Sequence, residues 1–156
     1  MNEGTGIKGH VKVELRDELG NMKHYQEFPN TITNVFDAHA AARLSGVSDN
    51  IISFIAIGSG DSQAAVDTTL DHLINIVALS GTTGSILQLT GANDNDLQAV
   101  GYWGAGAGTG SITEAGLFKM SGTTLGSMCA YTDSINVQKG ASDTLTLTWT
   151  LTLGSS

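Results

Sequence analysis

A strictly alternating segment stands near the C-terminal end of the sequence: Ser142-Asp143-Thr144-Leu145-Thr146-Leu147-Thr148-Trp149-Thr150-Leu151-Thr152-Leu153. Large apolar residues alternate with five threonines, so a β-strand would place one set on each of its faces. A helix would separate Leu145 from Leu147 by about 200° around its axis, which excludes a helix here. The segment predicts a long central strand. Its Leu and Trp side chains would face a second layer, and its threonines would face water or another protein.

The composition narrows the class of protein. The 156 residues carry a net charge of −8 without a basic patch, which argues against a nucleic-acid partner. No apolar run approaches about 18 residues, and Met1–Gly4 does not begin a classical signal peptide. We therefore expect no membrane partner, and synthesis in the cytoplasm without classical export. Cys129 is the one cysteine, so no internal disulfide is expected.

Further alternating or apolar segments lie upstream of the last strand, and 20 glycines with many Thr and Ser residues favour tight turns between them. Strands are predicted at residues 11–15, 22–28, 51–57, 73–79, 86–89, 97–103, 112–118, 125–131 and 142–153. The run Ile51–Ile57 is continuously apolar and predicts a strand that is buried on both faces. We expect an all-β fold, an antiparallel β-sandwich, in a single domain over residues 1–156 with a polar N-terminal arm of about residues 1–9.

One short helix is predicted near residues 35–45, with Asn34 as its N-cap and Gly46 just beyond its end. A spacing of four predicts that Phe36, Ala40 and Leu44 form its buried stripe. Residues 61–75 predict a loop, with a short helical turn at Thr68–Leu73.

The residues that could carry chemistry do not form a familiar constellation. His10, His24, His39 and His72 lack metal-ligand spacing. The glycine-rich run Gly104–Gly110 resembles a phosphate loop in its spacing. However, no Lys-Ser/Thr pair follows it, and a strand comes next where such loops need a helix. We interpret the run as a flexible connection between strands.

Acidic residues and the cysteine favour structural roles. Two sets of aspartates could hold calcium, but both lack the EF-hand glycine and terminal glutamate, so surface turn carboxylates are the favoured interpretation. The sets are Asp61, Asp67 and Asp71, and Asp94 and Asp96. Cys129 predicts an inert buried thiol, and Glu114 a structural carboxylate bonded to nearby backbone. Because no nucleophile–base pair emerges, we expect no enzymatic activity, no catalytic residue, no cofactor and no metal.

A series of short segments, taken in order, resembles a family of small virion structural proteins from tailed bacteriophages. The segments are Lys8–Val11, Leu19–Asn21, Asn30–Asn34, Ile55–Gly60, Asp67–Leu70, Gly106–Phe118, Ile135–Gly140 and Asp143–Trp149. The part Thr113–Phe118 also resembles a segment in the leading domains of phage tail-fibre and baseplate proteins. Residues around Ile86–Gln98 depart from the family as an insertion, which predicts a surface loop.

The resemblance implies a non-enzymatic structural protein that decorates the capsid or belongs to the tail. The sequence contains no coiled-coil heptads, repeats or fibrous shaft, which favours a capsid decoration (cement) protein on the virion surface. We expect a homo-oligomer, most simply a trimer, bound to the major capsid protein through the arm Met1–Gly9 and neighbouring loops. A tail, tail-fibre or baseplate module is the alternative. A carbohydrate-binding β-sandwich is the second alternative, with Tyr102 and Trp103 as its candidate aromatic residues.

Overall fold

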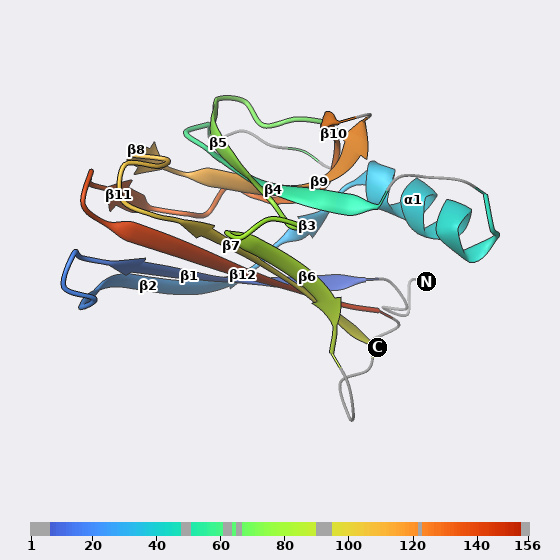
Figure 1. Cartoon of the computed structure of the whole chain (residues 1–156). Coiled ribbons are helices and arrows are strands. Elements are labelled where there is room, and N and C mark those ends of the chain that lie inside the picture. The colour runs from blue at the N-terminus through green and yellow to red at the C-terminus, as the bar shows by residue number, and fades with distance from the viewer. Residues whose placement is uncertain are drawn as a thin grey trace.

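The computed structural model describes residues 7–47, 51–60, 64, 67–89, 95–121 and 123–153. Two five-stranded antiparallel sheets pack face to face, beside a small two-stranded sheet (Figure 1). This confirms the predicted β-sandwich with one short helix. The elements are β1 (Lys8–Arg16), β2 (Met22–Pro29), β3 (Thr31–Ile32), α1 (Asn34–Leu44), β4 (Ile52–Gly58), β5 (Leu73–Ala78), β6 (Gly84–Gln88), β7 (Asp96–Trp103), β8 (Gly110–Ile112), β9 (Glu114–Ser121), β10 (Thr124–Thr132), β11 (Val137–Lys139) and β12 (Thr144–Thr152).

Strand β12 is the central strand of the first sheet, whose order is β2-β1-β12-β7-β6. The second sheet has the order β3-β10-β9-β4-β5, and β11 pairs with β8. In the ladders of β12, Trp149 lies opposite Val11 of β1 and Ala99 of β7. The predicted central position of the alternating strand is therefore confirmed.

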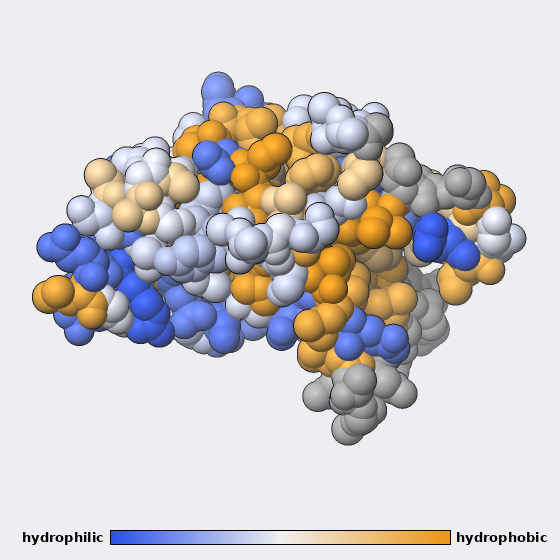
Figure 2. Space-filling model, in the orientation of Figure 1, coloured by the Kyte–Doolittle hydropathy of each residue, from blue (hydrophilic) through white to orange (hydrophobic). Residues whose placement is uncertain are grey.

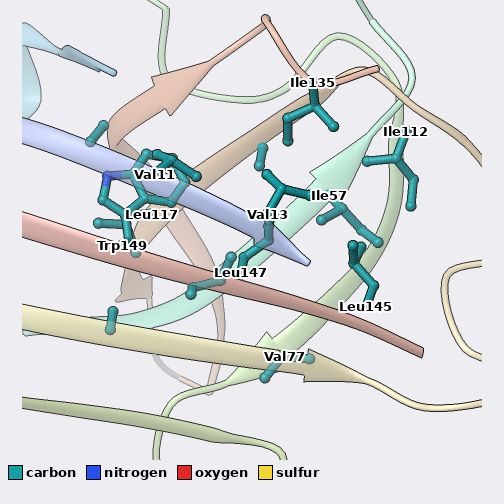
Figure 3. Packing of buried hydrophobic residues seen from close by; sticks show 14 of the residues in the cluster. Val11, Val13, Ile57, Val77, Ile112, Leu117, Ile135, Leu145, Leu147 and Trp149 are labelled. Atoms are coloured by element: carbon teal, nitrogen blue, oxygen red, sulfur yellow. The ribbon is translucent and has the colours of Figure 1, made fainter. Parts of the chain in front are cut away.

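The main core lies between the two sheets (Figure 3). Leu145, Leu147, Trp149 and Leu151 of β12 are all at most 1 % exposed, whereas the threonines between them are partly exposed. Alternation along the strand thus puts the apolar set inside, as predicted. Leu153 departs from the pattern because it lies beyond the end of β12, and its side chain is 41 % exposed.

Strand β4 is buried along its whole length, as its continuous apolar sequence predicts. One face of β4 joins the main core. The other joins a second cluster with Phe118 and Met128, and Leu70 of the β4–β5 connection packs on this cluster. The predicted helical turn at Thr68–Leu73 is wrong, because these residues bond to other segments: the Met128 N–H donates to Thr68 O at 3.0 Å. The connection therefore covers the outer face of the second sheet.

Two details of α1 differ from the sequence prediction. Thr33, not Asn34, is the N-cap, and its hydroxyl donates to Met128 O at 2.6 Å instead of capping the helix. Phe36 is buried and Ala40 packs against the core, as predicted, but Leu44 is 88 % exposed because the helix leads away from the sheets (Figure 1). His39 is buried in addition. Gly46 follows the helix with φ +77°, as predicted for the residue beyond its end.

The predicted N-terminal arm is too long, since Lys8 and Gly9 belong to β1 and lie opposite Thr152 and Leu151. The arm can comprise at most residues 1–7, of which 1–6 lie outside the described residues. The loop predicted at Ile86–Gln98 is wrong for its two ends, which form β6 and the start of β7, where the strands predicted at residues 86–89 and 97–103 are confirmed. In the described part of the chain, no helix is long and apolar enough to cross a membrane.

Candidate interaction surface

The four histidines lie on separate elements. His10 is in β1, His24 in β2, His39 in α1, and His72 just before β5. His10 Nε2 lies 3.7 Å from Glu27 on the neighbouring strand. Among the described residues, no three His, Cys, Asp or Glu side chains gather closely enough to hold a metal ion.

The described aspartates that were considered as calcium ligands, and Cys129, lie at separate places in the fold. Asp67 Oδ2 accepts a hydrogen bond from Ala64 N at 2.7 Å, and Asp96 Oδ1 accepts one from the Thr152 hydroxyl at 2.6 Å. Asp96 lies in β7, so it is not a turn carboxylate. Asp71 precedes β5, whereas Asp61 and Asp94 lie outside the described residues. The Cys129 thiol is buried in the core, as predicted.

Glu114 is a buried structural residue, which confirms its prediction. Its side chain is fully buried, and its two carboxyl oxygens accept hydrogen bonds from the backbone N–H groups of Asp71 at 3.2 Å and His72 at 2.8 Å. A Cβ atom at Gly58 or Gly60 would collide with this carboxyl group, so the two glycines give it room. Glu114 therefore fastens the β4–β5 connection to the second sheet.

The glycine-rich run connects β7 to β8, as predicted, and part of it packs into the core. A Cβ atom at Gly108 would lie 2.7 Å from Ile57 Cδ1 and 3.2 Å from Trp103 Cδ1, and Gly108 has φ +64°. The run therefore closes one end of the sandwich over the Trp103 indole. Trp103 is 1 % exposed, so of the aromatic pair predicted for carbohydrate stacking only Tyr102, 42 % exposed, reaches the surface.

Sequence reasoning missed a buried lysine beside this run. Lys139 is fully buried, and its Nζ donates to Gly104 O at 2.9 Å. Burial lowers the pKa of Lys139, and the nearby Asp143 carboxylate opposes that shift. Asp143 Oδ2 accepts hydrogen bonds from Lys23 Nζ at 2.8 Å and from Gly140 N at 2.8 Å, and these bonds lower the pKa of Asp143. The side chains of Lys23, Lys139 and Asp143 thus bring together β2, β11 and the turn before β12.

Asp143→Asn is expected to destabilise the fold more at pH 7 than at pH 3. The pKa of Asp143 is lower in the folded than in the unfolded chain, so its stabilising effect is present above the unfolded value of about 3.9. That effect disappears as the pH falls through the folded pKa. Urea titrations of both proteins at the two pH values measure it, with Glu18→Gln, at an exposed turn position, as the control. A destabilisation that does not change with pH would contradict the assignment.

No described element covers the outer face of the first sheet. We call it the threonine face, after the β12 side chains Thr144, Thr146, Thr148, Thr150 and Thr152 that form its middle column. Register places Lys12 on one side of Thr148 and Val100 on the other, and His10 and Gln98 on either side of Thr150. The threonine column and most of β7 are therefore uncharged, while Lys12 and Glu14 of β1 flank the column on one side.

The charges beside the threonine column balance one another. Three basic residues face outward on β1, and three acidic residues face outward on β1, β2 and β7: Lys8, Lys12 and Arg16, and Glu14, Glu27 and Asp96. Glu14 lies 3.8 Å from Lys12 Nζ and 3.4 Å from Arg16 Nη2. The face is thus neutral, although the whole chain carries a net charge of −8.

A second feature lies at the end of the molecule that bears α1. Apolar side chains gather along β6 and between β6 and α1 (Figure 2). They line a groove of about 340 Å³, which includes Ile51, Ile52, Ile86 and Leu97. The first described residues of the chain lie at this end too, because Lys8 pairs with Thr152.

Comparison with protein-family models, with curated proteins and with solved structures finds no match for this chain. Function is therefore inferred from the residues and surfaces of this chain itself.

Proposed function

We propose that this chain is a non-enzymatic structural protein of a tailed-phage virion, most simply a capsid decoration protein that binds the major capsid protein. The observation that carries the proposal is the threonine face, a sheet face that no described element covers and whose outward charges balance. A protein partner could cover the uncharged threonine column without removing charges from water, which is the costly part of forming a polar interface. The ordered sequence segments that resemble phage virion proteins support the same class.

The chain's shape suggests how attachment would be organised. Lys8, the first residue of β1, lies opposite Thr152 at one end of the threonine face. Many weak contacts, repeated over a particle surface, add up through multivalency. We therefore propose that the threonine face and the arm together contact the capsid, and that the bound form is a homo-oligomer.

Thr148→Arg is expected to reduce the occupancy of the protein on phage heads while leaving the fold intact. Thr148 is partly exposed at the centre of the threonine face, and an added cation there would have no acidic residue opposite it in the register.

Deleting residues 2–6 is expected to reduce occupancy and the resistance of heads to heat, without removing any part of β1. Quantitative mass spectrometry of purified heads and tails measures both effects.

Ser111→Arg is the matched control, since it introduces the same charge at an exposed position of β8, outside the threonine face. Equal occupancy of Thr148→Arg and the unmodified protein would remove the threonine face from the proposal. Recovery of the protein from tails alone would favour the tail or baseplate alternative, and its absence from particles would overturn the virion role.

A further inference from the structure

Strand β6 is a free edge of the first sheet, and its backbone shows which groups point outward. The Tyr102 N–H donates to Thr83 O at 2.8 Å, and the Leu89 N–H donates to Asp96 O at 2.9 Å. Hydrogen-bonded pairs alternate along an antiparallel ladder, so Ser85 and Leu87 bond toward β7. The backbone N–H and C=O of Ile86 therefore point away from the sheet, where the described strands provide no neighbour.

This edge lacks the features that usually protect an edge strand. No charged residue occurs between Leu73 and Leu89, a stretch that includes both β5 and β6. The opposite edge of the same sheet, β2, carries Lys23, Glu27 and Pro29. Charges and proline on an edge oppose pairing with another chain, so β2 is protected and β6 is open to it.

The apolar groove lies directly beside this open edge. β5 pairs with β4 only from Phe54 onward, so the first residue of β4, Ile52, has no β5 partner. The groove lies at this place and is lined by Ile52 and by Ile86 of β6. Leu87 and Ile51 are 48 % and 54 % exposed at its rim. A strand added to β6 would carry its inward side chains over the groove.

We propose that β6 pairs antiparallel with β6 of a second copy of this chain, centred on Ile86, so that two first sheets become one continuous sheet. The strand is self-complementary in this register: Ile86 lies opposite Ile86 of the partner subunit and Ser85 opposite Leu87 of the partner subunit. Each copy's Ile86 would help to cover the groove of the other. This two-fold contact is isologous.

The lack of charge on β6 allows a second copy to be the occupant. Two chains of net charge −8 repel each other over most of their surfaces, but here two uncharged strands would meet. The pairing gives a dimer, whereas the sequence led us to expect a trimer as the simplest homo-oligomer. It goes beyond the proposed function, because it requires neither a capsid nor any other partner.

Sedimentation equilibrium of the full chain tests the proposal. The unmodified protein is expected to approach twice its 16.1 kDa mass as its concentration rises. Leu87→Lys is expected to weaken the dimer about tenfold or more, because it places like charges on both copies at the paired edge. Leu19→Lys replaces an 82 % exposed leucine in the β1–β2 turn and is expected to leave the dimer unchanged.

Hydrogen exchange gives a second measurement on the unmodified protein. The Ile86 amide is expected to be protected at high concentration and to lose that protection on dilution, whereas the Leu87 amide stays protected by its bond to β7. A protein that stays monomeric at its solubility limit would overturn the proposal. So would a Leu87→Lys dimer as stable as the unmodified one, or Ile86 protection that does not depend on concentration.

Discussion

Trp149→Ala is expected to lower the free energy of unfolding by about 3–5 kcal/mol. Trp149 is fully buried at the middle of β12, between β1 and β7 in the central part of the first sheet. Its removal leaves a large cavity between the sheets, where Leu117 of β9 and Val11 also lie (Figure 3). Rigid sheets cannot close such a cavity completely. A urea titration followed by circular dichroism measures the loss.

Two further variants make this result specific to the inner face of β12. Thr148→Ser removes one methyl group from the opposite, partly exposed face and is expected to change stability by less than about 0.5 kcal/mol. Trp149→Phe is expected to cost less than Trp149→Ala, because it keeps a ring and removes an indole N–H without a hydrogen-bond partner in the described structure. Equal stability of the Trp149→Ala and Thr148→Ser proteins would contradict the assignment of the two faces.

The elements that could be predicted from the sequence are those whose burial follows a local pattern. Alternation in β12 gave its inner and outer faces, and the unbroken apolar run of β4 gave its burial on both faces. Both patterns depend on the side-chain period of a strand, which does not change with the neighbours that the strand acquires. The one helix was located for a similar reason, since its alanines and Gly46 act locally.

The errors occur where a distant segment competes with a local preference. Thr33, not the predicted Asn34, is the N-cap, and its hydroxyl bonds to Met128, 95 positions away. Leu44 belongs to the predicted stripe, but the sheets do not extend beneath that end of α1. Lys139 gives no sequence signal, because the carbonyl that accepts its bond belongs to Gly104 in another loop. Such pairings require the sheet order, which a single sequence does not contain.

For each of the two candidate surfaces, the threonine face and the β6 edge, one part could be predicted from the sequence and another could not. The threonine column could be predicted from the alternation in β12, whereas its neutrality depends on which charged residues β1 and β2 bring beside it. The uncharged stretch containing Ile86 is visible in the sequence. Its importance appears only when the topology places β6 at the edge of a sheet, with the groove beside it.

Glu114→Ala is expected to lower the free energy of unfolding by about 2–6 kcal/mol, from two hydrogen bonds worth about 1–3 kcal/mol each to a buried carboxyl group. The backbone N–H groups of Asp71 and His72 would both lose this acceptor. The connection that carries Leu70 would then be held less firmly on the second hydrophobic cluster. Urea titration measures the change in stability.

Hydrogen exchange at the same residues separates this role of Glu114 from a general loss of packing. In Glu114→Ala, the amides of Asp71 and His72 are expected to exchange faster than the overall destabilisation requires, while the Ile55 amide in β4 follows the overall change. Glu114→Gln is expected to lie between the two proteins, because its amide keeps one acceptor oxygen but turns an NH₂ group toward the other backbone donor. Exchange at Asp71 and His72 that merely follows the global stability would show that the carboxyl group does not fasten the connection.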